Sequence, residues 1–264
     1  MLLENWIIDF PTPNPTNKEH FIRMAITGPS DSGKSYMFKY IFQKFLGKQY
    51  ELVVIFCGSK DTLKEYKQLT GSKFCFETYN AEFIHLLKKQ QHNLIKQGKL
   101  PLRILIIYDD FSNRKNKGDL EVFNLAIQGR HDCISFIMIL HDLITLDRIV
   151  LDQMTHIITT RQMSANVFEK LAHQYLATLI ENDPKFNKHF IHSKKSDIIK
   201  YISKIFHNNT NNYNCIVILL ERYKKQVNQV HFSDIVKRIK AGPLSKPKEE
   251  PKGIMDVFEM YKED

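Results

Sequence analysis

Short runs of apolar residues alternate along the chain with segments in which apolar residues recur at helical spacing. The runs are rich in β-branched and aromatic side chains, which is typical of strands buried on both faces. They predict strands at 21–27, 51–57, 102–111, 133–140 and 156–161, with a shorter one near 73–79. Because parallel strands need long crossover connections, this alternation predicts an α/β fold with a mostly parallel sheet flanked by helices.

Helical periodicity fills the intervals between these runs. Apolar side chains line one side of a helix expected at 34–46, and further helices are expected from about residue 83 and at 119–128. After about residue 164 the pattern becomes mainly helical, at 164–182, 196–206 and 214–240. The expected organisation is an N-terminal arm (1–20), a core domain (21–165), a mainly helical C-terminal region (166–242) and a flexible tail (243–264).

Both ends of the sequence differ from the core. The N-terminus has acidic residues and "PTPNP", and it lacks the basic region and cleavage site of a secretory signal. The longest apolar runs are far shorter than the roughly 20 residues that cross a bilayer, so no membrane span is expected. The tail ends in amphipathic "GIMDVFEMYKED", which either docks to a capsid or portal protein or folds back on its own domain.

The formal net charge of +9 is concentrated in one part of the chain. Between Lys185 and Lys240, twelve lysines and arginines face three acidic residues, Asp197, Glu221 and Asp234, an excess of nine. The rest of the chain is therefore neutral. A basic C-terminal third indicates a polyanionic partner, and a solvated lysine-rich helical face remains the alternative.

Four cysteines lie far apart, at Cys57, Cys75, Cys133 and Cys215. They form no C-x-x-C pair and have no metal-ligand spacing. We expect them to be buried free thiols of an intracellular protein.

The first chemical motif is "GPSDSGKS", which fits G-x-x-x-x-G-K-[ST]. An apolar strand precedes it and a helix begins at Lys34, which is the context that a phosphate-binding loop requires. The loop would hold ATP, with Lys34 on the β- and γ-phosphates, Ser35 on Mg²⁺ and Gly33 permitting close backbone approach. The candidate nucleotide-binding residues are Gly28, Pro29, Ser30, Asp31, Ser32, Gly33, Lys34 and Ser35.

The second motif is "ILIIYDDF", an apolar strand that ends in two carboxylates. In a parallel sheet this end lies at the same edge as the phosphate loop. Asp109 is the candidate magnesium ligand, directly or through water, and Asp110 the candidate group that polarises the attacking water. The nearby "NKGD" matches a guanine-specifying pattern, but it lies in a polar loop and predicts a surface turn, so the expected nucleotide is ATP.

The third motif is "QGRHDCISFIMILHD". Arg130 and His131 precede a strand expected beside the magnesium strand, where they either cap the preceding helix or reach a nucleotide. That nucleotide would be their own or that of a neighbouring subunit, to which an arginine supplies charge stabilisation in trans. His141, at the far end of the strand, is the candidate sensor of the γ-phosphate.

Together, "RMAITGPSDSGKS", "LIIYDDF", "GRHDCISFIMIL" and "MTHII" resemble the poxvirus-type DNA-packaging ATPases of large DNA viruses and virophages, within the FtsK–HerA superfamily. The resemblance covers roughly residues 20 to 165 and implies a P-loop NTPase core of the RecA/FtsK kind. Two departures stand out. His141 occupies the place where the family usually has glutamine. Leu151 and Gln153 fall where it has Arg-x-Asn, so Arg130, Arg148 and Arg161 are candidates, in that order, for the trans-acting arginine.

The resemblance implies ATP-driven packaging of double-stranded DNA into preformed capsids, at a virus assembly site inside the host cell. The resemblance also implies a homo-oligomeric ring of about five or six subunits. The basic region would then grip DNA phosphates without reading sequence. The alternatives are a capsid-associated nucleotide-binding assembly module with little turnover, and a P-loop kinase or helicase-like ATPase.

Overall fold

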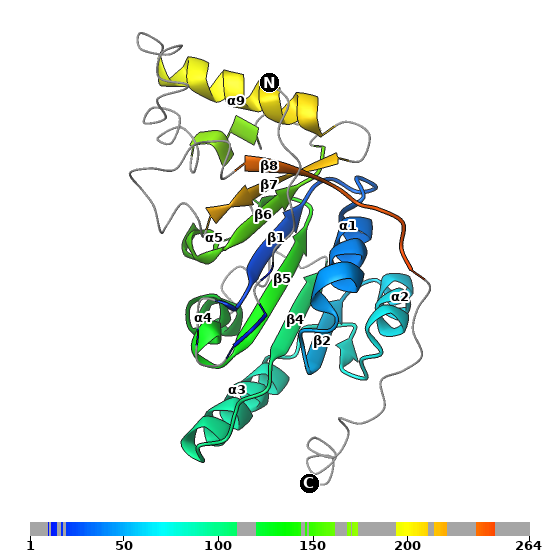
Figure 1. The fold of residues 1–264 in the computed structure, drawn as a ribbon, viewed down its shortest axis with the longest axis vertical. Helices are drawn as coiled ribbons and strands as arrows, with labels where there is room; N and C mark the ends of the chain where they lie inside the picture. The colour runs from blue at the N-terminus through cyan, green and yellow to red at the C-terminus, as the bar shows by residue number, and fades with distance from the viewer. Residues whose placement is uncertain are drawn as a thin grey trace.

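A mixed β-sheet forms the centre of the molecule (Figure 1). The computed structural model describes residues 10, 12–14, 17, 20–109, 120–143, 146, 148–161, 168–169, 171–173, 194–210, 214–220 and 236–245. Across these residues eight strands pair in the order β3-β2-β4-β5-β1-β6-β7-β8. They are β1 (Arg23–Thr27), β2 (Leu52–Cys57), β3 (Cys75–Phe76), β4 (Ile104–Asp109), β5 (Ile134–Leu140), β6 (His156–Thr159), β7 (Asn214–Leu219) and β8 (Val236–Lys240).

The register of the parallel strands gathers their carboxyl ends at one edge of the sheet. Thr27 of β1 lies opposite Leu140 of β5 on one side and Thr159 of β6 on the other. Asp109, the last residue of β4, lies opposite Ile139 of β5. We call this side of the sheet the carboxyl edge. Residues that follow β1, β4, β5 and β6 therefore start from neighbouring positions.

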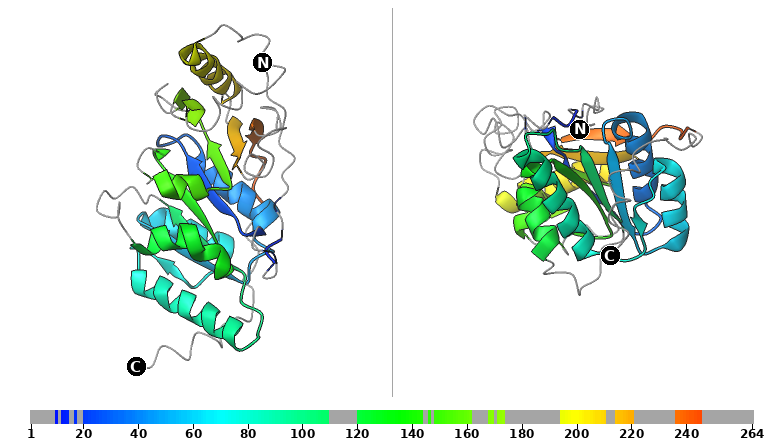
Figure 2. Two further views of the ribbon diagram at one scale, coloured as in Figure 1. Left: turned by 90° about the vertical axis from the view of Figure 1, so that its left-hand side faces the viewer. Right: turned by 90° about the horizontal axis from the view of Figure 1, so that it is seen from below.

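Helices cover both faces of the sheet (Figure 2). The helices α1 (Lys34–Ile41) and α2 (Lys60–Thr70) pack on one face, and a π-helical segment, Phe42–Leu46, extends α1. The other face is covered by α3 (Ala81–Lys96), α4 (Leu120–Gln128), α5 (Arg148–Gln153) and α9 (Lys195–Asn209). Every residue of β2, β4 and β5 is buried as a result.

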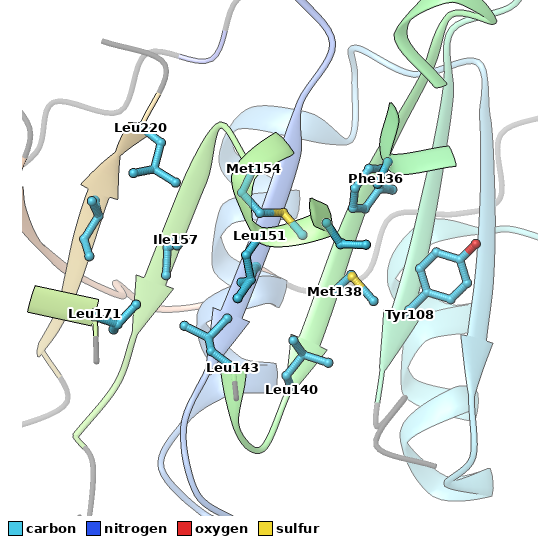
Figure 3. Packing of buried hydrophobic residues seen from close by; sticks show 14 of the residues in the cluster. Tyr108, Phe136, Met138, Leu140, Leu143, Leu151, Met154, Ile157, Leu171 and Leu220 are labelled. Carbon is cyan, nitrogen blue, oxygen red and sulfur yellow. The ribbon is translucent and has the colours of Figure 1, made fainter. Parts of the chain in front are cut away.

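Two apolar layers lie between the sheet and these helices. The layer under α1 and α2 includes Ile26, Phe38 and Leu63. The opposite layer includes Tyr108, Phe136 and Met154, and Figure 3 shows part of it, with side chains from β4, β5, α5 and β6 on this face of the sheet. Because apolar side chains point to both faces of the central strands, these strands read as continuous apolar runs in the sequence.

Local capping fixes the ends of two helices. The Ser59 side chain accepts a hydrogen bond from the Thr62 N–H at the start of α2, and Asn80 Oδ1 accepts one from the Phe83 N–H (2.9 Å) at the start of α3. At the end of α2, Gly71 adopts φ 64°, a left-handed conformation that glycine adopts without steric cost. Each side-chain cap contributes about 1 kcal/mol.

The strands expected between residues 21 and 161 are confirmed, with ends that differ by up to three residues. The helix expected at 196–206 is confirmed as α9. The helix expected at 214–240 is wrong, because Asn214–Leu219 and Val236–Lys240 form β7 and β8. Most of the expected helix at 164–182 and most of the tail fall outside the described residues.

The reason for this error lies in the apolar run "NCIVIL". Its β-branched residues favour a strand, and β7 pairs antiparallel with β6 through Ile157↔Ile218 and its neighbours. β8 then pairs antiparallel with β7. These two strands cover an edge of the parallel sheet that would otherwise expose unpaired backbone groups. The sheet therefore includes strands from both sides of the boundary expected at residue 165.

The segment after β8 runs back along α1 (Figure 1). The Tyr36 hydroxyl donates to the Gly242 carbonyl (3.2 Å). The Gln43 side chain donates to the Ser245 carbonyl (3.0 Å) and accepts from the Ser245 N–H (2.8 Å). The first residues of the expected tail, 243–245, thus lie against the α1 side of the molecule.

The expectation of buried free thiols is confirmed for three cysteines, whereas Cys75 is only partly buried. All four lie among the described residues without a disulfide, and Cys57, Cys133 and Cys215 are buried. Burial raises the pKa of the Cys215 thiol to about 12, so this thiol remains protonated at neutral pH. Among the described helices, none has both the length and the apolar character needed to cross a membrane.

Candidate functional site

The loop between β1 and α1 forms a concave stretch of backbone at the carboxyl edge. Its first residue is tied to the sheet, since the Gly28 N–H donates to the Leu140 carbonyl (3.2 Å). The Ser32 N–H donates to the Pro29 carbonyl (3.3 Å), which closes a turn. Asp31 (φ 57°) and Gly33 (φ 88°) both have positive φ. Positive-φ residues within such a turn direct successive N–H groups into a concavity that binds anions.

Gly28 lies where no side chain fits. A Cβ atom there would come within 1.7 Å of Thr160 Oγ1. Thr160 follows β6, and its hydroxyl donates to the Thr27 carbonyl (3.2 Å) and shares a hydrogen bond with the Ser32 hydroxyl (2.7 Å). The side of the loop that faces β6 is therefore held by a buried threonine, and glycine is required at residue 28 for this close approach.

The N-terminus of α1 faces the same concavity. Gly33 is its N-cap residue, so no side chain caps the first turn, and that turn contains no acidic residue. The exposed helix N-terminus carries roughly half a positive elementary charge. Lys34 is buried, 8% exposed, and its ammonium group donates to the Pro29 carbonyl (2.7 Å) across the loop. Backbone donors, the helix dipole and a lysine thus converge, an arrangement suited to phosphate groups.

Asp109 supplies a carboxylate at the same edge. It ends β4, which is separated from β1 by β5 alone, so the two strand ends are about 10 Å apart. Its side chain is largely buried, and its Oδ2 atom accepts a hydrogen bond from the Tyr66 hydroxyl (2.5 Å). Tyr66 belongs to α2 and is completely buried.

The tyrosine hydroxyl is held in its protonated form. Burial first, and then the negative charge of Asp109, raise the pKa of the Tyr66 hydroxyl far above its ordinary value. At neutral pH the hydroxyl is therefore protonated and donates to Asp109. Tyr66 of α2 thus holds the Asp109 carboxylate at the end of β4 through a neutral hydroxyl.

These residues fit a magnesium–nucleotide complex. The serine hydroxyl and the carboxylate are hard oxygen ligands of the kind that Mg²⁺ prefers. Among the described residues no three His, Cys, Asp or Glu side chains cluster as a complete metal site. One or two protein oxygens together with substrate phosphates and water are how Mg²⁺ is usually held at nucleotide sites.

The other candidate site residues lie in different parts of the structure. His141 follows β5 directly, is exposed, and starts beside the Leu140 carbonyl that holds Gly28. Arg161 follows Thr160 and is also exposed at the carboxyl edge. Arg148 begins α5, where it forms an exposed ion pair with Asp152 (3.9 Å). Asp110 lies outside the described residues.

Arg130 lies at the end of the sheet where the parallel strands begin, opposite the carboxyl edge. It belongs to the turn Gly129–His131 before β5, and the seven residues of β5 span about 23 Å between it and the loop. Gln91 holds this turn by donating to the carbonyls of Asp132 (2.9 Å) and Leu102 (2.6 Å). The exposed Arg130 side chain therefore does not join the phosphate loop of its own chain.

A family comparison adds independent information. Residues 14–230 match the sequence model of a family described as "Poxvirus A32 protein". Among curated proteins, none matches the chain.

Solved structures give matches of similar fold at low identity. The genome packaging NTPase B204 from Sulfolobus turreted icosahedral virus 2, in complex with ATP-gammaS, has 15% identity and a TM-score of 0.52; the match covers 88% of this chain and 100% of B204. The cytoplasmic domain of the Thermomonospora curvata type VII secretion ATPase EccC has 14% identity and a TM-score of 0.54, over 86% of this chain and 26% of EccC. The chain also spans 34% of EssC (ATPases 2 and 3) from Geobacillus thermodenitrificans, at 15% identity and a TM-score of 0.48.

Proposed function

Since this chain belongs to the poxvirus A32 protein family, we propose that it is an ATPase that moves double-stranded viral DNA into preformed capsids. The observation that carries this proposal is the placement of Lys34, Ser35 and Asp109 around one concave loop at the carboxyl edge. The fold that the chain shares with B204, a genome packaging NTPase, supports the same function.

The loop binds the triphosphate of ATP. Backbone N–H groups of the loop between Ser30 and Ser35 surround the phosphates, and Lys34 moves from the Pro29 carbonyl to the β- and γ-phosphate oxygens. Ser35 and Asp109 hold Mg²⁺, directly or through water. When bound, the metal offsets negative charge on the phosphate oxygens and keeps them in position.

Three further residues complete the proposed reaction. Asp110 orients the attacking water and accepts its proton. His141, which starts beside the loop, contacts the γ-phosphate or that water. Arg130, at the opposite edge, reaches the nucleotide of a neighbouring subunit and stabilises the charge that develops on the phosphoryl group. This last role requires a homo-oligomeric ring.

DNA would contact the basic C-terminal region. Exposed lysines lie along α9, namely Lys194, Lys195, Lys200 and Lys204, and Lys240 is exposed at the end of β8. Their ammonium groups suit phosphate oxygens and carry no base-specific information. The proposed DNA binding is therefore independent of sequence, and its place is the virus assembly site in the host cell.

Linear double-stranded DNA is expected to stimulate ATP hydrolysis several-fold, whatever its sequence, because the motor turns over productively only with its track. The measurement compares steady-state hydrolysis with and without two DNAs of unrelated sequence. Stimulation should fall as salt is raised from about 50 to 200 mM, since counterion release drives the binding. Hydrolysis by the Lys34→Ala variant, purified in the same way, measures the background from contaminating ATPases.

Two results would contradict the proposal. Tight ATP binding with no turnover, with or without DNA, would indicate a nucleotide-binding assembly module. ATP hydrolysis that DNA does not stimulate, at a salt concentration where DNA is shown to bind, would indicate an ATPase whose turnover is not coupled to DNA.

A further inference from the structure

Tyr66 is hydrogen-bonded to a candidate magnesium ligand, yet no motif contains it. Its hydroxyl donates to Asp109 Oδ2 (2.5 Å). Asp109 belongs to β4 and Tyr66 to α2, so one completely buried hydroxyl links α2 to the carboxyl end of β4.

The tyrosine ring is held from the α1 side. The Phe38 ring meets it edge to face, with centroids 5.3 Å apart. Lys39 Nζ lies 5.9 Å from the ring centroid and forms an ion pair with Glu65, the neighbour of Tyr66 in the sequence. These contacts fix the ring against the helix that carries Lys34 and Ser35, and hence fix the direction in which the hydroxyl points.

Given the nucleotide site proposed for this chain, on which the inference depends, we infer that Tyr66 is a positioning residue for magnesium. By donating to Oδ2, it orients the Asp109 carboxylate toward the metal or toward a metal-bound water. Because the Tyr66 ring packs against Phe38 of α1, the same side chain also relates this carboxylate to the helix that carries Ser35. Outer partners of this kind typically change metal affinity or activity about 10- to 100-fold when removed.

A purely structural role makes a different prediction. If the hydroxyl served only to satisfy a buried carboxylate, its loss would lower thermal stability without changing metal affinity selectively. A positioning role changes metal affinity while the affinity for metal-free nucleotide stays constant. Metal binding is thus the measurement that separates the two.

The experiment uses full-length wild type, Tyr66→Phe and, as a matched control, Tyr50→Phe. Tyr50 is a buried tyrosine next to the opposite end of β2, away from the carboxyl edge. Mn²⁺, a paramagnetic substitute for Mg²⁺, is titrated into each protein with ATP-gammaS, and free Mn²⁺ is followed by electron paramagnetic resonance. Calorimetry with ATP-gammaS in EDTA measures metal-free nucleotide binding, and thermal unfolding reports the fold.

Tyr66→Phe is expected to bind Mn²⁺ at least tenfold more weakly than wild type, with metal-free nucleotide affinity changed less than twofold. Tyr50→Phe should match wild type in both. In an Asp109→Asn background, Tyr66→Phe should cause no further loss, since the hydroxyl acts through that carboxylate. Tyr66→Met repeats the test should the phenylalanine variant fail to fold.

Equal Mn²⁺ affinity in wild type and Tyr66→Phe would overturn the inference and leave the proposed function standing. An equal loss of metal-free nucleotide affinity would also overturn it, since the site as a whole would then be damaged. Failure of wild type itself to bind Mn²⁺ with the nucleotide would overturn the proposed site, and the role of Tyr66 with it.

Discussion

Lys34→Ala is expected to lower ATP hydrolysis by at least about 100-fold, because it removes the cation that stabilises charge on the β- and γ-phosphates. The side chain is only 8% exposed and already reaches across the loop to the Pro29 carbonyl. No other lysine or arginine lies within the loop segment from Gly28 to Ser35 to replace it. Steady-state hydrolysis at saturating Mg·ATP measures the loss.

The control for this variant is Lys44→Ala. Lys44 lies in the π-helical segment that extends α1, is exposed, and is remote from the helix N-terminus. It should hydrolyse ATP at the wild-type rate. Circular dichroism must show both variants folded. A folded Lys34→Ala protein that retains more than half of the wild-type rate would contradict the assigned role.

Asp109→Asn is expected to lower hydrolysis by about 100-fold and to raise the Mg²⁺ concentration needed for half-maximal activity. Asparagine keeps the size of the side chain and can still accept a hydrogen bond from Tyr66, so the change removes the negative charge and little else. Hydrolysis measured across a Mg²⁺ titration at fixed ATP separates a metal defect from a folding defect.

Asp61→Asn serves as the matched substitution, because Asp61 is an exposed carboxylate in the first turn of α2. It should leave the Mg²⁺ titration unchanged. If Asp109→Asn had the same Mg²⁺ dependence and rate as wild type, Asp109 would be excluded as a metal ligand.

The core of the fold could be predicted because its signals are local. β4 and β5 are apolar throughout, since both of their faces are covered, and the helix starting at Lys34 follows a run of turn-forming residues. The phosphate loop is a contiguous motif with its strand and helix beside it. Asp109 was found from its place at the end of an apolar strand, because carboxyl ends of parallel strands meet at one edge.

The C-terminal strands were missed because their signal is ambiguous. β7 is a six-residue strand that is apolar after Asn214, and an apolar run this short does not separate a buried strand from a helix by periodicity. The basic residues around it suggested a helical face. What decides the conformation is a non-local contact, the antiparallel pairing of β7 with β6.

The supporting residues of the site were missed for a similar reason. Tyr66 is 43 residues from Asp109 in the sequence, and Thr160 is 128 residues from Ser32, so no spacing rule joins either pair. Both are brought into contact by the strand order. The position of Arg130 likewise depends on strand direction, which places it at the edge opposite the loop.

The most direct test of the central claim is a crystal structure of the protein with Mg²⁺ and ATP-gammaS. The account predicts the triphosphate within the loop of residues 28–35, Lys34 on its terminal phosphates, and a single Mg²⁺ bound by Ser35 with Asp109 in its coordination shell, directly or through one water. A structure with the nucleotide bound elsewhere, or with Mg²⁺ in the loop and the Asp109 carboxylate turned away from it, would contradict the account.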